Sequence, residues 1–417
     1  ACSGWPSTPV GGAGRCDHMI AEGGGPEGRL RADFATRAYF FDRNGAPWPA
    51  GHLLRNPEYA ATLRAIATQG PSAMTQGPIA DSIVAAAQRG PRAGTLTLAD
   101  LQAYQPKRTS PVCGMYRAYV VCSMAPPSSA NATIAILSLY ERARPQPVGV
   151  GNVDDWSAFL WASRLAYADR DHYMADDEFV QAPTRELIAP AYLDERARLI
   201  DLGHAPERVE PGIPAGQELF DRWGRHSSDD TGTTHLSVVD SFGNAVALTA
   251  TVESYFGAQR MASGFFLNNE LTDFSFVPAI NGRPVANAVE PRKRPRSSMS
   301  PTIVTDRNGE LVLVIGSPGG SSIISYVARA TIAILDWNMP VQEALGVGNV
   351  TARYDTARGE LARLPEGVNA ALTQRGWRIG DVGDEGSGLH AIRVTPNGLE
   401  GGADPRREGR VGRLAAE

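Results

Sequence analysis

The chain has 417 residues, of which 42% are hydrophobic and 20% are charged, and its formal net charge at pH 7 is −5. This composition is ordinary for a globular protein with an ample core, and it excludes an intrinsically disordered chain. The slightly acidic balance gives no reason to expect nucleic acid or an anionic membrane as a partner, and the sequence contains no apolar run long enough to span a bilayer.

The first half of the chain is predicted to be mainly helical. Residues 1–28 are rich in glycine and show neither helical nor strand periodicity, which is typical of a loop or a chain end. A short strand is expected over residues 38–41, before a turn at 42–45. A further strand is expected over residues 116–124. Caps, prolines in first turns and apolar periodicity predict helices over residues 56–70, 79–89, 97 onward, 132–142, 156–170 (amphipathic) and 190–200.

Cysteine usage does not reveal the cellular compartment, because four cysteines are too few for a disulfide scaffold. Cys113 and Cys122 would pair if the strand that contains Cys122 folded back on the preceding residues. We expect instead that both are free, partly buried thiols.

Strands dominate the second half. Prolines and glycines between residues 203 and 232 predict a flexible connector. The strands and helices expected after it are a hairpin over residues 233–251, a second hairpin pairing 302–305 with 311–315 across an Asn-Gly turn, a helix over 321–336, and strands around 389–394 and 399–402. Strands with helices before and between them suggest sheets covered by layers of helices.

The point where the connector meets the first hairpin is the centre of the predicted chemistry. A polar segment ends at Gly232 and runs into Thr233. If the chain were cut before Thr233, a free α-amine with a pKa near 8 would lie beside the hydroxyl of the same residue as a general base. His235 would face the same side of the strand, so a Thr–His pair is conceivable. From this stretch alone, an ordinary hairpin is the better interpretation.

A glycine-rich turn, Gly316–Gly320, precedes the helix over residues 321–336. The N–H groups of Gly319 and Gly320 are available at a helix N-terminus and suit an oxyanion hole. A plain strand-to-helix turn explains the same pattern.

Two further polar groups describe a pocket for the charged ends of an amino acid. Glu253, Glu270 and Asp273 are suited to hold an ammonium group, and Ser297 and Ser298 to hold a carboxylate. Each group taken alone is better explained as a set of polar side chains that face solvent. The sequence has no zinc, EF-hand, Walker A or dinucleotide motif, so neither a dedicated metal site nor a cofactor is predicted.

Four stretches, taken together in their order and spacing, resemble the gamma-glutamyltransferase (gamma-glutamyltranspeptidase) family. They are TTHLSVVD at residues 233–240, LNNELTDFS at 267–275, PRSSMSPT at 295–302 and GSPGG at 316–320. The resemblance extends to LAYADR at residues 165–170 and GADPR at 402–406, and covers residues 29–413.

The resemblance implies an α+β fold, the αββα sandwich of the N-terminal-nucleophile hydrolases, with two stacked central sheets flanked by helices. It implies a zymogen that cuts itself between Gly232 and Thr233. Residues 29–232 would then form a partial large-subunit-like region that ends in the connector, and residues 233–417 the small-subunit-like catalytic region. The two chains would stay associated, and residues 1–28 lie outside the matching pattern.

The resemblance also implies an activity, that of a gamma-glutamyl hydrolase or transferase acting on glutathione and related compounds without a cofactor. A threonyl acyl-enzyme would pass its gamma-glutamyl group to water or to an amino acid or peptide. Such enzymes work in the periplasm or outside the cell. The implied roles are nucleophile for Thr233, support of that nucleophile for Thr251, oxyanion N–H groups for Gly319 and Gly320, α-ammonium ligands for Glu253, Glu270 and Asp273, and α-carboxylate ligands for Ser297 and Ser298.

The chain departs from the family pattern at its beginning. The family's glycine-rich N-terminal motifs, and its arginine that pairs with the substrate α-carboxylate, have no counterpart here, so we expect an N-terminally truncated or altered chain. Two alternatives stay open: a cephalosporin (glutaryl) acylase of the same superfamily, and an inactive remnant that is neither cleaved nor catalytic. Because glutaryl substrates lack an α-ammonium group, the retention of Asp273 with two glutamates favours the gamma-glutamyl activity.

Overall fold

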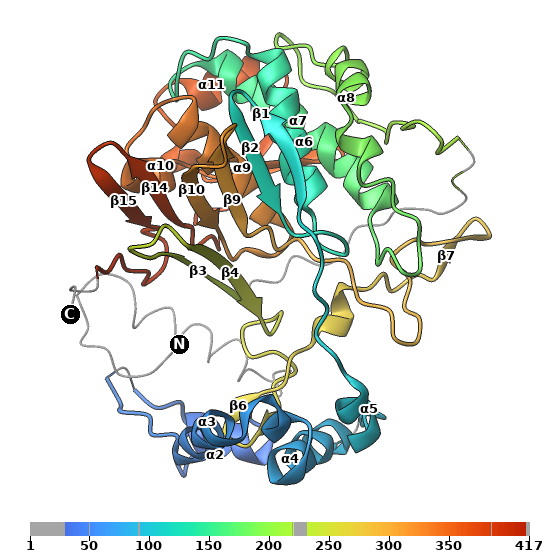
Figure 1. The fold of residues 1–417 in the computed structure, drawn as a ribbon, viewed down its shortest axis with the longest axis vertical. Helices are drawn as coiled ribbons and strands as arrows, with labels where there is room; N and C mark the ends of the chain where they lie inside the picture. The colour runs from blue at the N-terminus through green and yellow to red at the C-terminus, as the bar shows by residue number, and fades with distance from the viewer. Residues whose placement is uncertain are drawn as a thin grey trace. The chain divides into compact units, whose positions relative to one another are not determined.

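A computed structural model describes residues 30–49, 51–90, 92–218, 220, 232–384 and 386–413. The predictions for residues 1–28 and for the last part of the connector lie outside these described residues. The described chain divides into two compact units. The first unit lies within residues 1–108 and 251–270, and the second within residues 109–250 and 271–417; Figure 1 colours both by residue number.

The first unit consists of short helices and one small strand pair. Helix α3 begins as predicted, because the side chain of Asn56 accepts a 2.8 Å hydrogen bond from the N–H of Tyr59. The predicted capping box of Thr97 and Asp100 starts α5. The elements of the first unit are α2 (Phe34–Phe40), α3 (Pro57–Gln69), η1 (Gly70–Met74), α4 (Gly77–Gln88), α5 (Leu98–Ala103), β5 (Met261–Ala262) and β6 (Phe265–Phe266).

The strand predicted over residues 38–41 is wrong, because these residues end helix α2. Asp33 caps this helix by accepting a hydrogen bond of 3.2 Å from the N–H of Thr36. Phe40 packs edge-on against Phe256 at a ring-centroid distance of 5.3 Å. A cap and aromatic packing therefore override the strand propensity of the aromatic run.

The second unit is built on a six-stranded antiparallel sheet in the order β1-β2-β9-β10-β14-β15. The hairpin predicted to pair residues 302–305 with 311–315 is confirmed, and so are the strands predicted around residues 389–394 and 399–402. Its strands are β1 (Val112–Tyr116), β2 (Tyr119–Ser123), β9 (Thr302–Asp306), β10 (Leu311–Gly316), β14 (His390–Thr395) and β15 (Gly398–Ala403).

Helices and a small sheet cover one face of this sheet, where α6 and α9 pack against its strands (Figure 1). Helix α7 is buried on nearly all sides, so the expectation of an amphipathic helix is wrong; α6, α11 and β11 surround it. The elements are α6 (Ala130–Ala143), α7 (Val153–Tyr173), η2 (Glu186–Ile188), α8 (Pro190–Ala197), η4 (Gly320–Ser322), α9 (Ile323–Leu335), α10 (Val341–Gly346), η5 (Leu361–Arg363), α11 (Val368–Gln374), β11 (Val350–Arg353), β12 (Thr356–Gly359) and β13 (Ile379–Asp381).

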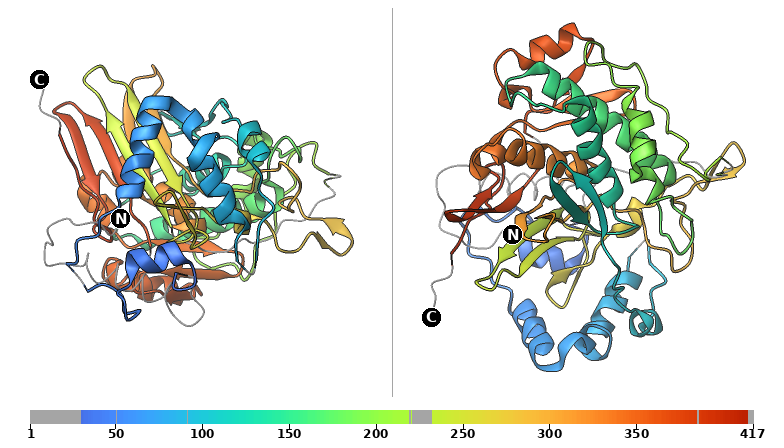
Figure 2. Two further views of the ribbon diagram at one scale, coloured as in Figure 1. Left: turned by 90° about the horizontal axis from the view of Figure 1, so that it is seen from below. Right: turned by 45° about the horizontal axis from the view of Figure 1, so that its top comes forward.

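The hairpin predicted to start at Thr233 is confirmed as the ribbon of β3 (Thr233–Val239) and β4 (Ala245–Thr251). Strand β3 packs against β10 and β14, on the face of the sheet away from α6 and α7 (Figure 2). The outward face of the ribbon is apolar, with four side chains that are 44–50% exposed: Leu236, Val238, Val246 and Leu248. The remaining elements of the unit are η3 (Glu270–Asp273), β7 (Ala279–Ile280) and β8 (Arg283–Pro284).

The expectation of two free thiols is wrong, because Cys113 and Cys122 form a disulfide. The single strand predicted over residues 116–124 is a hairpin, with Arg117 in its turn at a φ of 57°. This hairpin places Cys113 directly opposite Cys122. None of the described helices is long and apolar enough to cross a membrane.

Removal of this disulfide by Cys113→Ala with Cys122→Ala is expected to lower the free energy of unfolding by about 2–3 kcal/mol, because the cross-link restricts the unfolded chain. Urea unfolding of both proteins measures the difference. Iodoacetamide applied to the denatured, unreduced protein should leave both cysteines unmodified. Alkylation of both cysteines without reductant would contradict the pairing.

Candidate active site

The candidate nucleophile, Thr233, opens β3 and is only 6% exposed. Its backbone oxygen accepts a hydrogen bond of 2.9 Å from Nη1 of Arg407. Nη2 of Arg407 donates to the backbone oxygen of Gly386. Thr251 closes β4, so the two threonines lie at the end of the ribbon away from its turn.

Two close approaches connect the start of β3 with the glycine-rich turn, one through His235 and one through Arg407, which bonds the backbone of Thr233. The ring of His235 lies so close to Gly316 that a Cβ there would be 2.2 Å from the ring's Cε1 atom. A Cβ on Gly388 would be 2.7 Å from Cδ of Arg407 and 2.8 Å from Cγ of Pro318. The structure therefore brings Thr233 and the predicted oxyanion turn to the same part of the second unit.

The turn itself requires glycine. Gly319 has a φ of 135°, and a Cβ there would lie 2.3 Å from the ring of Tyr326. Because Gly319 and Gly320 precede the first full helical turn, their N–H groups have no partner within the helix. The hydroxyl of Tyr167, on α7, donates a hydrogen bond of 2.6 Å to the backbone oxygen of Ser321 and so fixes the start of this helix.

The two predicted carboxylate ligands, Ser297 and Ser298, are both half-buried. Oγ of Ser297 accepts a hydrogen bond of 3.2 Å from the N–H of Met299. Oγ of Ser298 accepts one of 2.6 Å from Nη2 of Arg170. Because each hydroxyl oxygen already accepts, each hydroxyl hydrogen is left to donate to another acceptor. The pair is thus suited to an anion.

The three predicted ammonium ligands are divided between the units. Glu253 is buried, with a φ of 75°, and its carboxylate accepts hydrogen bonds from Ser254 and Asn269. The N–H of Glu270 donates to the side chain of Asn268 at 3.0 Å. Both glutamates therefore contact the Asn268-Asn269 pair in the first unit, whereas Asp273 belongs to the second unit. The convergence of all three carboxylates stays a prediction.

A buried amide links Asp273 to the serine pair. Asn287 is 1% exposed, and its Nδ2 donates a hydrogen bond of 2.7 Å to the backbone oxygen of Asp273. Its Oδ1 accepts one of 2.9 Å from the N–H of Arg296, the residue before Ser297. One side chain therefore fixes the backbone on both sides of the predicted amino-acid pocket.

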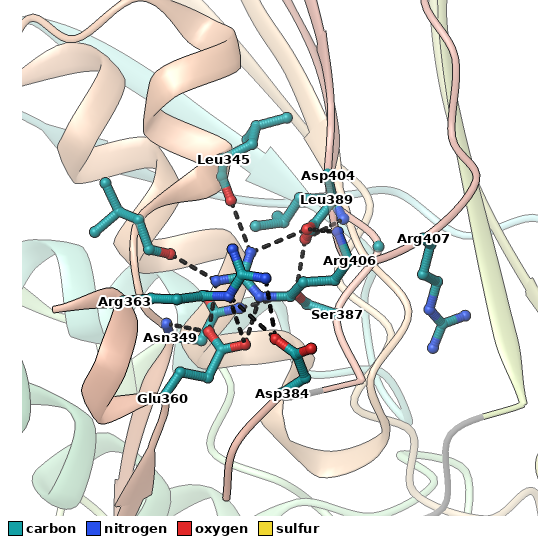
Figure 3. Close-up of polar contacts among 12 residues, drawn as sticks. Leu345, Asn349, Glu360, Arg363, Asp384, Ser387, Leu389, Asp404, Arg406 and Arg407 are labelled. Carbon is teal, nitrogen blue, oxygen red and sulfur yellow. Dashed lines mark hydrogen bonds and ion pairs between the residues drawn. The ribbon is translucent and has the colours of Figure 1, made fainter. Parts of the chain in front are cut away.

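A charged network holds Arg407 in place beside Thr233. The preceding residue, Arg406, pairs with Glu360 at 2.5 Å and with Asp404 at 2.9 Å, as Figure 3 shows. Burial by itself would raise the pKa of Asp404, but Arg406 holds that pKa below its usual value. The N–H of Arg407 donates a hydrogen bond of 3.3 Å to the backbone oxygen of Asp404, so this network fixes the backbone from which Arg407 reaches Thr233.

The conceivable Thr–His pair is wrong. Nδ1 of His235 lies 2.8 Å from Oγ1 of Thr249, and Nε2 lies 3.1 Å from Oγ of Ser237. Both ring nitrogens are therefore engaged away from Thr233. Burial, together with the nearby His390, lowers the pKa of His235 to about 3, so the ring is neutral at pH 7.

Sequence reasoning missed Arg170, Asn287 and Arg407. Arg170 ends the LAYADR stretch, and Arg407 follows the GADPR stretch, so both belong to or adjoin matching segments. No local pattern connects them with Ser298 or Thr233, however. Among the described residues, no cluster of His, Cys, Asp or Glu side chains is placed to hold a metal ion.

A model of the family described as Gamma-glutamyltranspeptidase matches residues 19–414. The chain belongs to this family. A glutathione hydrolase proenzyme of Escherichia coli (strain K12) is 36% identical over 384 residues, which cover 89% of this chain and 63% of that protein. The acylase ACY 1 proenzyme of a Pseudomonas species (strain V22) is 32% identical and is matched over 88% of this chain and 62% of its own length. The chain thus spans less than two thirds of these relatives.

The fold is shared with a solved structure, that of a cephalosporin acylase from Bacillus halodurans. The two chains superpose with a TM-score of 0.82 at 24% identity, over 99% of this chain and 72% of the other. The N-terminal-nucleophile hydrolase fold expected from the sequence is confirmed.

The acid sensitivity of this protein is expected to depend on His235. Folding lowers the pKa of this residue from about 6.5 to about 3, so its stabilising contribution is fully present above about pH 6.5 and is lost as the pH falls toward 3. Between about pH 7 and pH 4, the free energy of unfolding should therefore fall more steeply for the wild type than for His235→Gln. Chemical denaturation at several pH values measures both slopes.

A His235→Gln slope equal to that of the wild type would refute the assignment.

Proposed function

We propose that this protein is a self-processing gamma-glutamyl hydrolase or transferase that acts on glutathione and related compounds through a threonyl acyl-enzyme. The observation that carries this proposal is that Thr233 opens β3 and that His235, two residues further on, packs against Gly316 at the start of the glycine-rich turn. Membership of the family, and relatives named glutathione hydrolase proenzymes, support it.

The proposed reaction begins with cleavage of the bond between Gly232 and Thr233: Oγ1 of Thr233 attacks the carbonyl carbon of Gly232, the acyl group moves from nitrogen to oxygen, and water hydrolyses the resulting ester to a Gly232 carboxylate and a free Thr233. The freed α-amine of Thr233 takes the hydroxyl proton, and Oγ1 attacks the gamma-carbonyl carbon of the substrate. The N–H groups of Gly319 and Gly320 stabilise the negative oxygen of the tetrahedral intermediate. The intermediate expels the amine of the leaving group, which receives the proton from the Thr233 ammonium. Water or an acceptor amine then attacks the ester and regenerates the hydroxyl.

The other predicted residues would bind the substrate's glutamyl end and support the nucleophile. In this proposal Thr251 supports Thr233, and three carboxylates hold the α-ammonium group through charge-assisted hydrogen bonds: Glu253, Glu270 and Asp273. The hydroxyls of Ser297 and Ser298 hold the α-carboxylate. Their available hydrogens support this role.

The two chains produced by cleavage would remain associated. Strand β2 precedes the cut, whereas its hydrogen-bonded neighbour β9 follows it. Helix α6 precedes the cut and packs against α9, which follows it. Separation of the chains would therefore expose the buried core of the second unit.

We propose that the protein works in the periplasm or outside the cell. The disulfide between Cys113 and Cys122 supports this location, because such bonds persist in oxidising compartments.

Self-cleavage is the direct test of the proposed chemistry. The purified wild-type protein should run as two bands on a denaturing, reducing gel, and Thr233→Ala should run as one, because the attacking hydroxyl is lost. Thr234→Ala is the matched control and should still give two bands, since the neighbouring hydroxyl is on the exposed side of β3. A single wild-type band would favour the inactive remnant.

Substrate choice separates the gamma-glutamyl activity from that of an acylase. We expect a gamma-glutamyl anilide to be hydrolysed at least about 10-fold faster than a glutaryl anilide, because only the former offers an ammonium group to the carboxylates. The ratio of the two kcat/KM values measures this preference. The relative named acylase ACY 1 makes the alternative concrete, and faster turnover of the glutaryl compound would establish it.

A further inference from the structure

Arg170 is the residue that sets the hydrogen-bonding role of Ser298. It lies near the end of α7, is 1% exposed, and donates the 2.6 Å hydrogen bond from Nη2 to Oγ of Ser298. In the described part of the chain, the Ser298 hydroxyl donates to no acceptor. A hydroxyl that accepts from a guanidinium group must point its hydrogen elsewhere, and that hydrogen becomes a stronger donor.

The position of Arg170 is determined by contacts on its other nitrogens. Nη1 donates to a carboxylate oxygen of Asp171 at 2.7 Å, and Nε donates to Oγ of Ser129 at 3.1 Å. Ser129 in turn donates to the backbone oxygen of Ser297 at 2.6 Å. Arg170 therefore contacts the serine pair directly at Ser298 and indirectly at Ser297.

Asp171 is shared by two further arginines and is itself 1% exposed. Nη2 of Arg296 lies 3.3 Å from this carboxylate, and Nη2 of Arg353 lies 2.8 Å from it. Burial, and repulsion by Arg170, lower the pKa of Arg296 to about 9, so it remains charged at pH 7. Positive charge is thus concentrated behind the serine pair, where it favours an anion on the accessible side.

The same helix also holds the oxyanion turn. Tyr167 donates to the backbone oxygen of Ser321, and Arg170 donates to Ser298. Residues three apart lie on one face of a helix, about 5–6 Å from each other. Helix α7 therefore fixes the separation between the proposed oxyanion N–H groups and the serine hydroxyls.

We propose that Arg170 is a positioning residue that makes Ser298 a hydrogen-bond donor to the substrate, and so selects compounds with a free α-carboxylate over their α-carboxamides. This inference rests on the proposed function for its choice of substrate. A carboxylate accepts from both serine hydroxyls, whereas a carboxamide offers one acceptor oxygen and an NH2 group that only donates.

The test compares a gamma-glutamyl anilide with its α-carboxamide in the wild type and in Arg170→Met. We expect kcat/KM for the carboxylate compound to fall about 10- to 100-fold, through KM, and kcat/KM for the carboxamide to change less than about 3-fold. Arg353→Met is the matched control, because Arg353 also pairs with Asp171 but acts on neither serine hydroxyl. Because this variant removes one positive charge near the serine pair but no hydrogen bond to either serine, it should lower the carboxylate preference less than about 3-fold.

A double-mutant cycle shows whether Arg170 acts through Ser298. In a Ser298→Ala background, Arg170→Met should change the carboxylate preference less than about 3-fold further. Full additivity of the two substitutions, or a wild-type preference in Arg170→Met, would overturn the inference. If Arg170→Met does not fold, Arg170→Lys replaces it. Lysine keeps a positive charge beside Asp171, but one ammonium group cannot serve Asp171, Ser129 and Ser298 together as the guanidinium does, so the carboxylate preference should still fall.

Failure of the proposed function gives a different result. Every Arg170 variant should still cleave itself, because this step involves no substrate carboxylate. If the wild type shows neither cleavage nor turnover, the proposed function fails, and calorimetric binding of L-glutamate and of its α-amide then decides the inference. Equal affinity of the wild type for both compounds, or an unchanged preference in Arg170→Met, would overturn it.

Discussion

The candidate site depends on one buried carboxylate, Asp171. Its arginine partners come from three parts of the second unit: α7 supplies Arg170, the segment before Ser297 supplies Arg296, and β11 supplies Arg353. Burial by itself would raise the pKa of Asp171, but attraction by the three arginines holds that pKa well below its usual value. A buried charge is tolerated only when it is paired, so the arginines and the carboxylate keep one another in place. The polypeptide segments that carry them are thereby held together.

Further long-range contacts connect the segments that carry the predicted site residues. Helix α7 contacts Ser321 through Tyr167 and Ser298 through Arg170. Asn287 joins the backbone of Asp273 to that of Arg296. A second charged network fixes Arg406 and Asp404, and Arg407, the next residue, donates to the backbone oxygen of Thr233. The segments that carry the proposed nucleophile, the oxyanion turn and the serine pair are therefore each held by contacts with buried side chains. This suits a reaction that requires preorganised donors.

Much of the fold was predictable because its signals are local. The caps at Asn56 and Thr97 and the ribbon beginning at Thr233 depend on residues only a few positions apart. The failures involve competition from distant partners. Phe40 joins a helix because it packs against Phe256, and Cys122 pairs because a hairpin places Cys113 opposite it. Helix α7 carries polar residues that look solvent-facing in the sequence but form buried ion pairs.

The sequence by itself determined the family, the fold class, the strand that begins at Thr233 and the glycine-rich turn at Gly319. Motif order and short-range periodicity carry that information directly. Only the tertiary structure decided which side chains control these groups. Arg170 and Ser298 are 128 residues apart, and Arg407 and Thr233 are 174 residues apart. No local pattern encodes such pairs, because each contact exists only after burial of apolar residues has packed distant segments of the chain together.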